Sequence, residues 1–375
     1  MVRLGDIFTI SSGGTPDKRQ TKYYKNGTIP WVKTGDLKEK YVSRNTERIT
    51  PEGLRNSSAK LFPAGTVLVA MYGATIGACS ILDFESSTNQ ACAAFLPASK
   101  VLPDYLYYFL QSKKDIFVQS GVGGAQPNIS VGYLKGFPFD VISIESQRKI
   151  VSALDSVSTL ISLRRQQLAK LDELVRARFM EMFSACTQKD MLGNIVSISR
   201  GASPRPISAY VTEDMDGVNW IKIGDVPENS LYIERTKEKI TLEGAKKSRY
   251  VYKGDFILSN SMSFGRPYIL NIDGCVHDGW LIISDYLAAF HPLYLYYAIR
   301  DFEVQNQFCE KATGATVKNL NSDLVKSTLI KVPPMELQHE FSESASKIEQ
   351  TKSTIRQGLD KLEILKKSLM QEYFG

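Results

Sequence analysis

The sequence predicts an α+β protein built from two tandem mixed α/β domains and a long antiparallel two-helix coiled coil, arranged as a pseudo-twofold internal repeat. The first observation is length, because 375 residues exceed what one compact core accommodates. The second is that motifs of the first half return in the second half. The third is a pair of long tracts, residues 146–183 and 337–374, with apolar side chains at heptad spacing.

The internal repeat has one long period. The offset between matching positions drifts only from 188 to 191 residues, so insertions between the copies are few. We therefore expect a first domain at 1–145 with its helix at 146–187, and a second domain at 188–335 with its helix at 336–375. The matching motifs are Leu4-Gly5 with Leu192-Gly193, Trp31 and Asp36 with Trp220 and Asp225, Tyr105–Tyr108 with Tyr294–Tyr297, and Glu145-x-Gln147 with Glu336-x-Gln338.

Each domain body is expected to combine short strands with one short helix. Apolar runs at 66–70 and 255–258 are bounded by glycine, proline and serine, which is typical of strands and turns. Pro103 and Pro292 each precede an aromatic, leucine-containing stripe, and proline favours the first turn of a helix.

Both long tracts place apolar residues four and three positions apart in alternation, which is the pattern of a coiled coil. Each tract would be about 57 Å long as a helix and would extend beyond a domain of this size, so we expect the two to pair. Arg164, Arg178, Lys352 and Lys366 share the pattern and either set the register of the seam or face other proteins. The predicted apolar seam consists of Ile150, Leu154, Val157, Ile161, Leu168, Leu171, Val175, Phe341, Ile348, Ile355, Leu359, Leu362 and Leu369.

The two helices are predicted to run antiparallel. The first ends near Phe183, the second domain intervenes, and the second helix begins just after Pro334. Because compact domains tend to hold their termini close together, the second helix starts near the end of the first and runs back along it. Two unlike domains are then presented in inverted orientation, and duplex DNA has a matching dyad that lets two reading heads address two half-sites.

Composition excludes several classes of protein. A hydrophobic content of 43% and a mean hydropathy of −0.17 are ordinary for a globular chain, and no apolar run reaches the length of a bilayer span. Five scattered cysteines and three histidines without ligand spacing favour neither a disulfide framework nor a metal site. These features fit a cytoplasmic protein, and the net charge of +6 allows an anionic partner.

An ordered set of motifs resembles the DNA specificity subunits of type I restriction-modification systems. The resemblance covers essentially the whole chain, and the Glu-x-Gln that opens each long helix completes it. The second half departs from it, because Ser261–Arg266 replaces Gly-Ala-Thr-Ile-Gly and His277-Asp278-Gly279 replaces Asn-Gln. The motifs of the first half are Gly13–Pro16, Ile29–Asp36, Met71–Gly77, Thr88–Ala91 and Gln126–Ser130.

The resemblance implies two target-recognition domains, each of which reads one half of an interrupted, asymmetric sequence in double-stranded DNA. It also implies that the coiled coil sets the half-site spacing and docks two modification (methyltransferase) subunits, which recruit restriction subunits carrying the translocase and nuclease. AdoMet, ATP and Mg are then expected on those partner subunits only, and this chain is expected to be a non-catalytic subunit without a metal or cofactor.

The candidate DNA-contacting residues are polar side chains of loops, because Arg and Lys pair with guanine edges and Asn and Gln with adenine edges. A role in a turn or helix cap is the competing interpretation for each one. Trp31 and Trp220 are instead expected to anchor the cores, and Asp36 and Asp225 to fix turns. The candidates are Lys18, Arg19, Lys22, Lys33, Thr34, Tyr72, Thr75, Asn89, Gln90, Gln126 and Asn128 in the first half, and Arg200, Ser203, Arg205, Lys222, Ser261, Ser263, Arg266, Lys318 and Asn319 in the second.

Two other functions stay open on the sequence alone. Asp17, Asp36 and Lys38 match a loose pattern of magnesium-dependent nucleases, although the second copy lacks it. The other alternative is a coiled-coil scaffold that binds only protein. A methyltransferase motif is not recognisable, and the absence of any Gly-Lys dipeptide excludes the Walker A loop of an ATPase.

Overall fold

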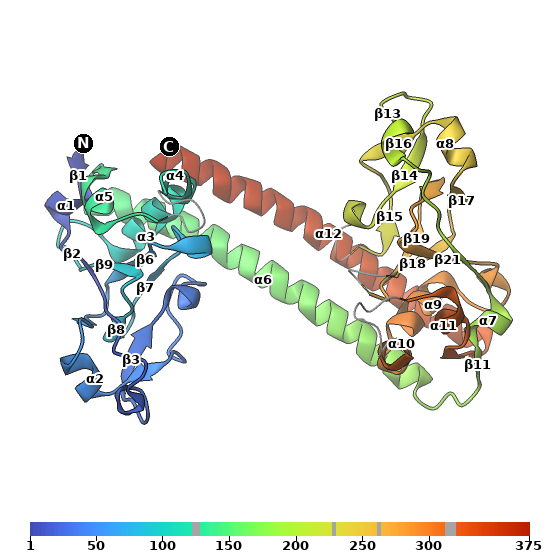
Figure 1. Cartoon of the computed structure of the whole chain (residues 1–375), viewed down its shortest axis with the longest axis horizontal. Coiled ribbons are helices and arrows are strands. Elements are labelled where there is room, and N and C mark those ends of the chain that lie inside the picture. Colours follow the sequence, from blue (N-terminus) through green and yellow to red (C-terminus); the bar gives the residue numbers. More distant parts are fainter. Residues whose placement is uncertain (122–127, 227–229, 261–263, 312–319) are drawn as a thin grey trace. The chain divides into compact units, whose positions relative to one another are not determined.

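The computed structural model describes residues 1–121, 128–226, 230–260, 264–311 and 320–375, and Figure 1 traces its elements. The chain divides into two compact units. Unit 1 comprises Met1–Arg165 and Gln357–Gly375, and unit 2 comprises Gln166–Arg356. Each long helix therefore contributes one part to unit 1 and the other part to unit 2.

Unit 1 contains two small sheets of four strands. The sheet with strand order β2-β9-β6-β7 is antiparallel, and the sheet with order β4-β3-β8-β5 pairs β3 and β8 in parallel. A separate ladder joins β1 to β10. The strands are β1 (Val2–Arg3), β2 (Ile10–Ser12), β3 (Ile29–Val32), β4 (Arg48–Ile49), β5 (Leu61–Phe62), β6 (Val67–Ala70), β7 (Cys79–Ile81), β8 (Ser86–Thr88), β9 (Cys92–Phe95) and β10 (Pro138–Phe139).

Short helices cover the sheets of unit 1. The helix α3 lies against β6 and β7, and Pro103 occupies its first turn as predicted. The helices are α1 (Leu4–Ile7), α2 (Pro51–Arg55), α3 (Pro103–Ser112), α4 (Lys114–Gln119) and α5 (Val131–Gly136), with single 3-10 turns η1 (Thr21–Tyr23), η2 (Thr34–Asp36) and η3 (Gly73–Thr75).

Unit 2 repeats this architecture with five-stranded sheets of order β12-β21-β18-β19-β15 and β13-β16-β14-β20-β17, and a β11-β22 ladder. The strands are β11 (Lys189–Met191), β12 (Ser197–Arg200), β13 (Val211–Thr212), β14 (Val218–Ile221), β15 (Tyr232–Ile233), β16 (Glu238–Ile240), β17 (Arg249–Val251), β18 (Phe256–Ser259), β19 (Pro267–Leu270), β20 (Gly274–Val276), β21 (Trp280–Ser284) and β22 (Leu329–Lys331). The helices are α7 (Leu192–Ile195), α8 (Leu242–Lys246), α9 (Pro292–Arg300), α10 (Phe302–Lys311) and α11 (Ser322–Lys326), with 3-10 turns η4 (Ile207–Ala209), η5 (Ile223–Asp225) and η6 (Tyr286–Ala288).

The two units share one topology, which confirms the predicted internal repeat. The strand order β2-β9-β6-β7 corresponds to β12-β21-β18-β19, and β4-β3-β8-β5 corresponds to β16-β14-β20-β17. Unit 2 adds β15 and β13 at the ends of its two sheets. The matched tryptophans Trp31 and Trp220 are each 1% exposed in small cores, so the prediction that they are core anchors is confirmed.

The long helices α6 (Ile144–Phe183) and α12 (Met335–Phe374) each begin two residues before the heptad tracts predicted at 146–183 and 337–374. The Ser143 hydroxyl accepts a hydrogen bond from the Ser146 backbone N–H (3.2 Å) and caps the first turn of α6. At α12, the Pro334 carbonyl accepts from the Gln338 N–H (3.2 Å). The start of α6 is therefore set by the Ser143 cap, and that of α12 by the first backbone hydrogen bond after Pro334.

The helices pack antiparallel, as predicted. In unit 1 the first part of α6 meets the last part of α12, where Arg165 forms an ion pair with Glu363 (2.7 Å). In unit 2 the last part of α6 meets the first part of α12, where the rings of Phe179 and Phe341 lie 5.4 Å apart. The predicted seam residues that are buried are Leu154, Val157, Ile161, Val175, Phe341 and Ile355, and those that are half-buried are Ile150, Leu168, Leu171, Ile348, Leu359, Leu362 and Leu369.

The polar side chain Lys352 is buried at the seam of unit 2, with an exposed fraction of 5%. Its ammonium group lies 2.6 Å from the Asp172 carboxylate on α6 and 2.5 Å from the Glu349 carboxylate on α12. The Tyr297 hydroxyl of α9 donates to the same Glu349 carboxylate (2.7 Å). Lys352 therefore connects the two long helices at one register, which supports the register-setting interpretation.

The other polar heptad positions differ from one another. Arg178 also crosses the seam and pairs with Glu340 (3.0 Å). Lys366 is half-buried and lies 6.0 Å from the centre of the Tyr108 ring, whereas Arg164 is exposed. The Arg178 ion pair thus links the two long helices in unit 2.

The glutamine of each Glu-x-Gln motif is fully buried and joins the start of a long helix to its domain. The Gln147 side chain accepts from the Leu102 N–H and donates to the carbonyls of Lys100 and Ile142, all at 2.9 Å. Gln338 repeats the arrangement by accepting from the His291 N–H (2.9 Å) and donating to two carbonyls of unit 2. The repeated motif therefore fixes each helix to the loop that precedes α3 or α9.

Candidate nucleic-acid interface

In unit 1 the segments that carry the sequence motifs meet around the loop 89–91 between β8 and β9. Four backbone hydrogen bonds hold them together, although the segments lie between residues 14 and 129 of the chain. We call residues 13–16, 71–77, 88–91 and 128–129 the first loop cluster. The bonds run from Gly14 N to Thr88 O (2.9 Å), Asn89 N to Val32 O (2.9 Å), Met71 N to Ala91 O (2.8 Å) and Ile129 N to Met71 O (3.0 Å).

Unit 2 repeats the same four hydrogen bonds. We call residues 201–205, 260, 264–266, 277–279 and 320 the second loop cluster. The shared bonds place His277-Asp278-Gly279 at the position of Asn89-Gln90-Ala91. They run from Ala202 N to Val276 O (3.1 Å), His277 N to Ile221 O (3.3 Å), Asn260 N to Gly279 O (3.0 Å) and Leu320 N to Asn260 O (2.8 Å).

A glycine allows the close approach in each cluster. A Cβ atom on Gly13 would lie 2.2 Å from the Thr88 carbonyl oxygen, and one on Gly201 would lie 2.2 Å from the His277 carbonyl oxygen. Both contacts are far shorter than any real Cβ tolerates. The repeated Gly13 and Gly201 are therefore explained by backbone packing beneath the loops.

The first loop cluster presents polar side chains to solvent. Tyr72 is 44% exposed and its backbone pairs with that of Asn128, which is exposed as well. Gln90 is exposed and its side-chain oxygen accepts a hydrogen bond from the Thr15 hydroxyl. Thr75 is half-buried and donates to the Tyr72 carbonyl (3.0 Å), a role in a turn. The structure thus brings Tyr72, Gln90 and Asn128 together, with Asn89 half-buried among them.

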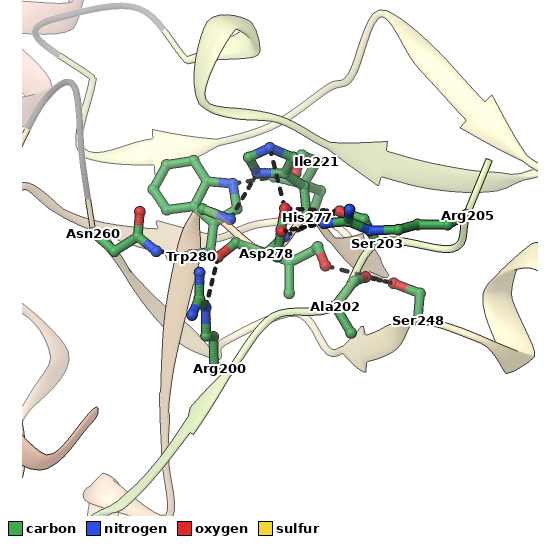
Figure 2. Close-up of polar contacts among 12 residues, drawn as sticks. Arg200, Ala202, Ser203, Arg205, Ile221, Ser248, Asn260, His277, Asp278 and Trp280 are labelled. Atoms are coloured by element: carbon green, nitrogen blue, oxygen red, sulfur yellow. Dashed lines mark hydrogen bonds and ion pairs between the residues drawn. The ribbon is translucent and has the colours of Figure 1, made fainter. Parts of the chain in front are cut away.

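Asp278 is the centre of the second loop cluster, as Figure 2 shows. The Ser203 hydroxyl donates to one carboxylate oxygen (2.9 Å), and an Arg205 Nη atom lies 3.4 Å from the other. The Asp278 carbonyl accepts from Arg200 Nε and from the Asn260 side-chain amide, both at 3.0 Å. The backbone and the side chain of Asp278 are therefore both held in place.

The surroundings of Asp278 and His277 lower the pKa of both side chains. Partial burial acts to raise the pKa of the Asp278 carboxyl, but the Ser203 hydrogen bond and the nearby His277 outweigh it, so the pKa lies below its usual value. Burial lowers the pKa of His277, and the neighbouring Asp278 only partly opposes this. Asp278 is thus an anion near neutral pH and can hold a guanidinium group.

The matched lysines at the start of η2 and η5 are held by carboxylates. Lys33 pairs with Glu47 and Lys222 pairs with Glu238, and both lysines are half-buried. The carboxylate of Asp36 accepts from the Lys33 N–H (2.8 Å). Asp225 likewise accepts from the Lys222 N–H (3.1 Å), so the predicted turn role of both aspartates is confirmed. Thr34 is half-buried in the same turn.

The basic loop before η1 is exposed, and two of its cations have acidic partners. Arg19 pairs with Asp17 (2.9 Å) and Lys22 pairs with Glu52 (2.5 Å), while Lys18 is exposed. No described hydrogen bond or ion pair joins these three side chains to the first loop cluster. The remaining candidate Arg266 is exposed beside Gly265, whereas Gln126, Ser261, Ser263, Lys318 and Asn319 lie outside the described residues.

The carboxylates of the nuclease alternative already have protein partners. Asp17 accepts from the Arg19 guanidinium and Asp36 accepts from the Lys33 N–H. Within the described parts of the chain, no group of three or more His, Cys, Asp or Glu side chains could hold a metal ion. No helix in the part of the chain that the structure describes is both long enough and apolar enough to cross a lipid bilayer.

Sequence reasoning did not select Asp278, His277 or Asn260 as site residues. The available signal was the repeat itself, since the offset of 188 carries Asn89 and Gln90 onto His277 and Asp278. The departure of the second half from the motif pattern marks where the two loop clusters differ chemically.

Comparisons with known proteins agree with the repeat. The family model for the type I restriction modification DNA specificity domain matches twice, at residues 1–173 and 189–363. The chain is 27% identical over 181 residues to the EcoR124I/EcoR124II type I restriction enzyme specificity subunit of Escherichia coli, covering 47% of this chain and 45% of that protein. It is 30% identical over 190 residues to the MjaIX specificity subunit of Methanocaldococcus jannaschii, covering 48% and 43%. The chain thus spans about half the length of the curated relatives it matches.

Solved structures share the fold. The crystal structure of the type I restriction-modification S subunit from M. genitalium has a TM-score of 0.56 at 15% identity, over 100% of this chain and 95% of that one. A chain from a structural study of assembly and conformational transition in a type I system has a TM-score of 0.61 at 16% identity, over 100% and 96%. Because the family model matches both halves, with the repeat and the antiparallel helices as its structural counterpart, this chain belongs to the type I restriction-modification DNA specificity family.

Proposed function

We propose that this chain is the non-catalytic specificity subunit of a type I restriction-modification complex and selects the DNA sequence on which that complex acts. Each unit reads one half of a bipartite, asymmetric site in double-stranded DNA, through the first loop cluster in unit 1 and the second in unit 2. The antiparallel helices set the spacing between the half-sites. AdoMet, ATP and Mg belong to the partner subunits.

One observation carries this proposal. The two loop clusters have the same backbone hydrogen bonds but different side chains, with Asn89-Gln90 in one and His277-Asp278 in the other. A shared backbone frame supports the same mode of docking, and different donors and acceptors support reading of different bases. Identical clusters would instead favour a symmetric site.

Exposed apolar side chains on the long helices support the proposal that other subunits bind there. Large apolar side chains that do not face the seam stay exposed on both helices, which is expected where another protein covers them. We propose that two modification subunits dock there and that restriction subunits join through them. The exposed residues are Leu160, Leu163, Leu174, Met180, Ile364 and Leu365.

The test is selection of binding sites from a random double-stranded DNA library, with the full chain alone and together with its modification subunits. We expect a two-block motif with a fixed gap. Tyr72→Ala and Asn128→Ala should relax one block only, and Arg200→Gln should relax only the other. Degradation of both blocks by a change in either unit would overturn the assignment of one unit to one half-site.

The same experiment separates the two alternatives. A magnesium-dependent nuclease would cleave library DNA once magnesium is added to the chain alone, and Asp17→Asn would abolish that cleavage. A scaffold that binds only protein would retain no DNA sequence at any salt concentration. Binding that weakens with salt but still selects one motif is the result expected of a specificity subunit.

A further inference from the structure

The second loop cluster contains an arginine–carboxylate pair at a position where the first contains an amide. Ser203 contacts Asp278 in unit 2 just as Thr15 contacts Gln90 in unit 1. Both loop clusters therefore have a hydroxyl donor at this position, Thr15 or Ser203. The side chain that accepts its hydrogen bond differs between them. In unit 2 this side chain has a negative charge and an arginine beside it.

From this arrangement we infer that Arg205 and Asp278 act as one reading unit that requires a G·C base pair in the half-site of unit 2. The inference rests on the proposed function, because it names the base pair that one end of the site selects. It assigns a specificity-determining role to Asp278 as well as to the arginine.

The backbone of Asp278 is fixed by several hydrogen bonds, so its carboxylate can position a neighbouring guanidinium group. Its carbonyl receives hydrogen bonds from Arg200 and Asn260, and its N–H donates to the Ser203 oxygen (3.2 Å). Ser203 donates to one carboxylate oxygen, and His277 Nε2 lies 3.5 Å from the same oxygen. The second oxygen is the one that Arg205 approaches (Figure 2).

Arg205 remains available to a ligand. Its side chain is 83% exposed, and only one Nη atom approaches the carboxylate, at 3.4 Å. A guanidinium has five N–H donors in a planar fork, so a contact on one edge leaves donors for another acceptor. The carboxylate limits the orientations of that fork, which lowers the entropy cost of binding.

The chemistry of the pair matches G·C better than A·T. Guanine presents two acceptors in the major groove, N7 and O6, which suit the arginine fork, and cytosine presents an amino donor, which suits a carboxylate. A·T presents an amino donor on the purine, which would face arginine donors. A carboxylate is also repelled by phosphates, so it fits a position facing base edges better than one facing the backbone.

The experiment compares Arg205→Gln, Arg205→Lys and Asp278→Asn with the unchanged chain, by selection from the random library and by binding to the selected duplex. All three changes should relax one G·C position of a single block, with a loss of roughly 5- to 150-fold in preference at that position. Arg205→Lys keeps the charge but lacks the fork, so its salt dependence should be unchanged. Arg148→Gln, which removes an exposed charge on α6, is the control.

The outcomes separate this inference from the proposed function. If no variant changes the motif while the chain still selects two blocks, the reading unit is refuted and the proposed function stands. If Arg205→Gln and Arg205→Lys weaken all sequences equally, or if Arg205→Lys behaves as the unchanged chain, Arg205 contacts phosphate and the inference fails. If the unchanged chain selects no motif at all, the proposed function fails first.

Discussion

Replacement of Lys352 by methionine tests how the seam of unit 2 is stabilised. Methionine has a similar length but no charge, so the Asp172 and Glu349 carboxylates lose their shared cation. Removal of one partner from a buried ion pair costs roughly 3–5 kcal/mol, because the other charge stays without compensation. The side chain of Asp172 is 47% exposed and can be rehydrated, whereas that of Glu349 is 14% exposed. We therefore expect Lys352→Met to lower the free energy of unfolding by about 3 kcal/mol.

The assay is urea unfolding at neutral pH, followed by circular dichroism. Lys347→Met removes an exposed lysine from the same helix and should change the free energy of unfolding by less than about 0.5 kcal/mol. The double variant Lys352→Met/Glu349→Met removes both buried charges and should recover much of the loss. Equal unfolding midpoints for Lys352→Met and Lys347→Met would refute the reasoning that a buried cation holds this seam.

Three further variants test individual contacts in unit 2. Gln338→Leu leaves the His291 N–H and two carbonyls without partners and should cost about 3 kcal/mol of unfolding free energy, measured by urea titration; an unchanged midpoint would mean that water replaces the side chain. Gly201→Ala places a Cβ against the His277 carbonyl and should weaken selection of one half-site only, as read from the selected motif. The Lys189 hydrogen bond holds the pKa of Glu303 below its usual value, so its stabilising contribution is present at neutral pH and is lost as the pH falls through that lowered pKa. Lys189→Met should raise the Glu303 pKa in an NMR titration, and an unshifted titration would contradict the contact.

The helices and the repeat were predictable because their signals are periodic. Heptad spacing located α6 and α12 to within two residues, and the repeated Pro103 and Pro292 marked the starts of α3 and α9. The heptad pattern places the helix starts half a turn too late, because these depend on the Ser143 cap and on the first backbone bond at Pro334.

The loop clusters could be predicted only in part. Motifs identified the segments, but their convergence depends on backbone hydrogen bonds such as Met71 N to Ala91 O, which no local pattern encodes. Lys22 was selected for its charge, and its partner Glu52 lies 30 residues away along the chain. Asp278 is not among the predicted site residues, because its role depends on the tertiary contacts with Ser203 and Arg205.

We propose that the antiparallel helices act as a spacer between the two units that read the half-sites. Insertion of one heptad into both α6 and α12, at the level of the paired Arg165 and Glu363, lengthens the seam by about 10 Å while its register is kept. Since duplex DNA rises 3.4 Å per base pair, the gap in the selected two-block motif should grow by roughly 3 base pairs with both blocks unchanged. An unchanged gap, with both blocks still selected, would contradict the account.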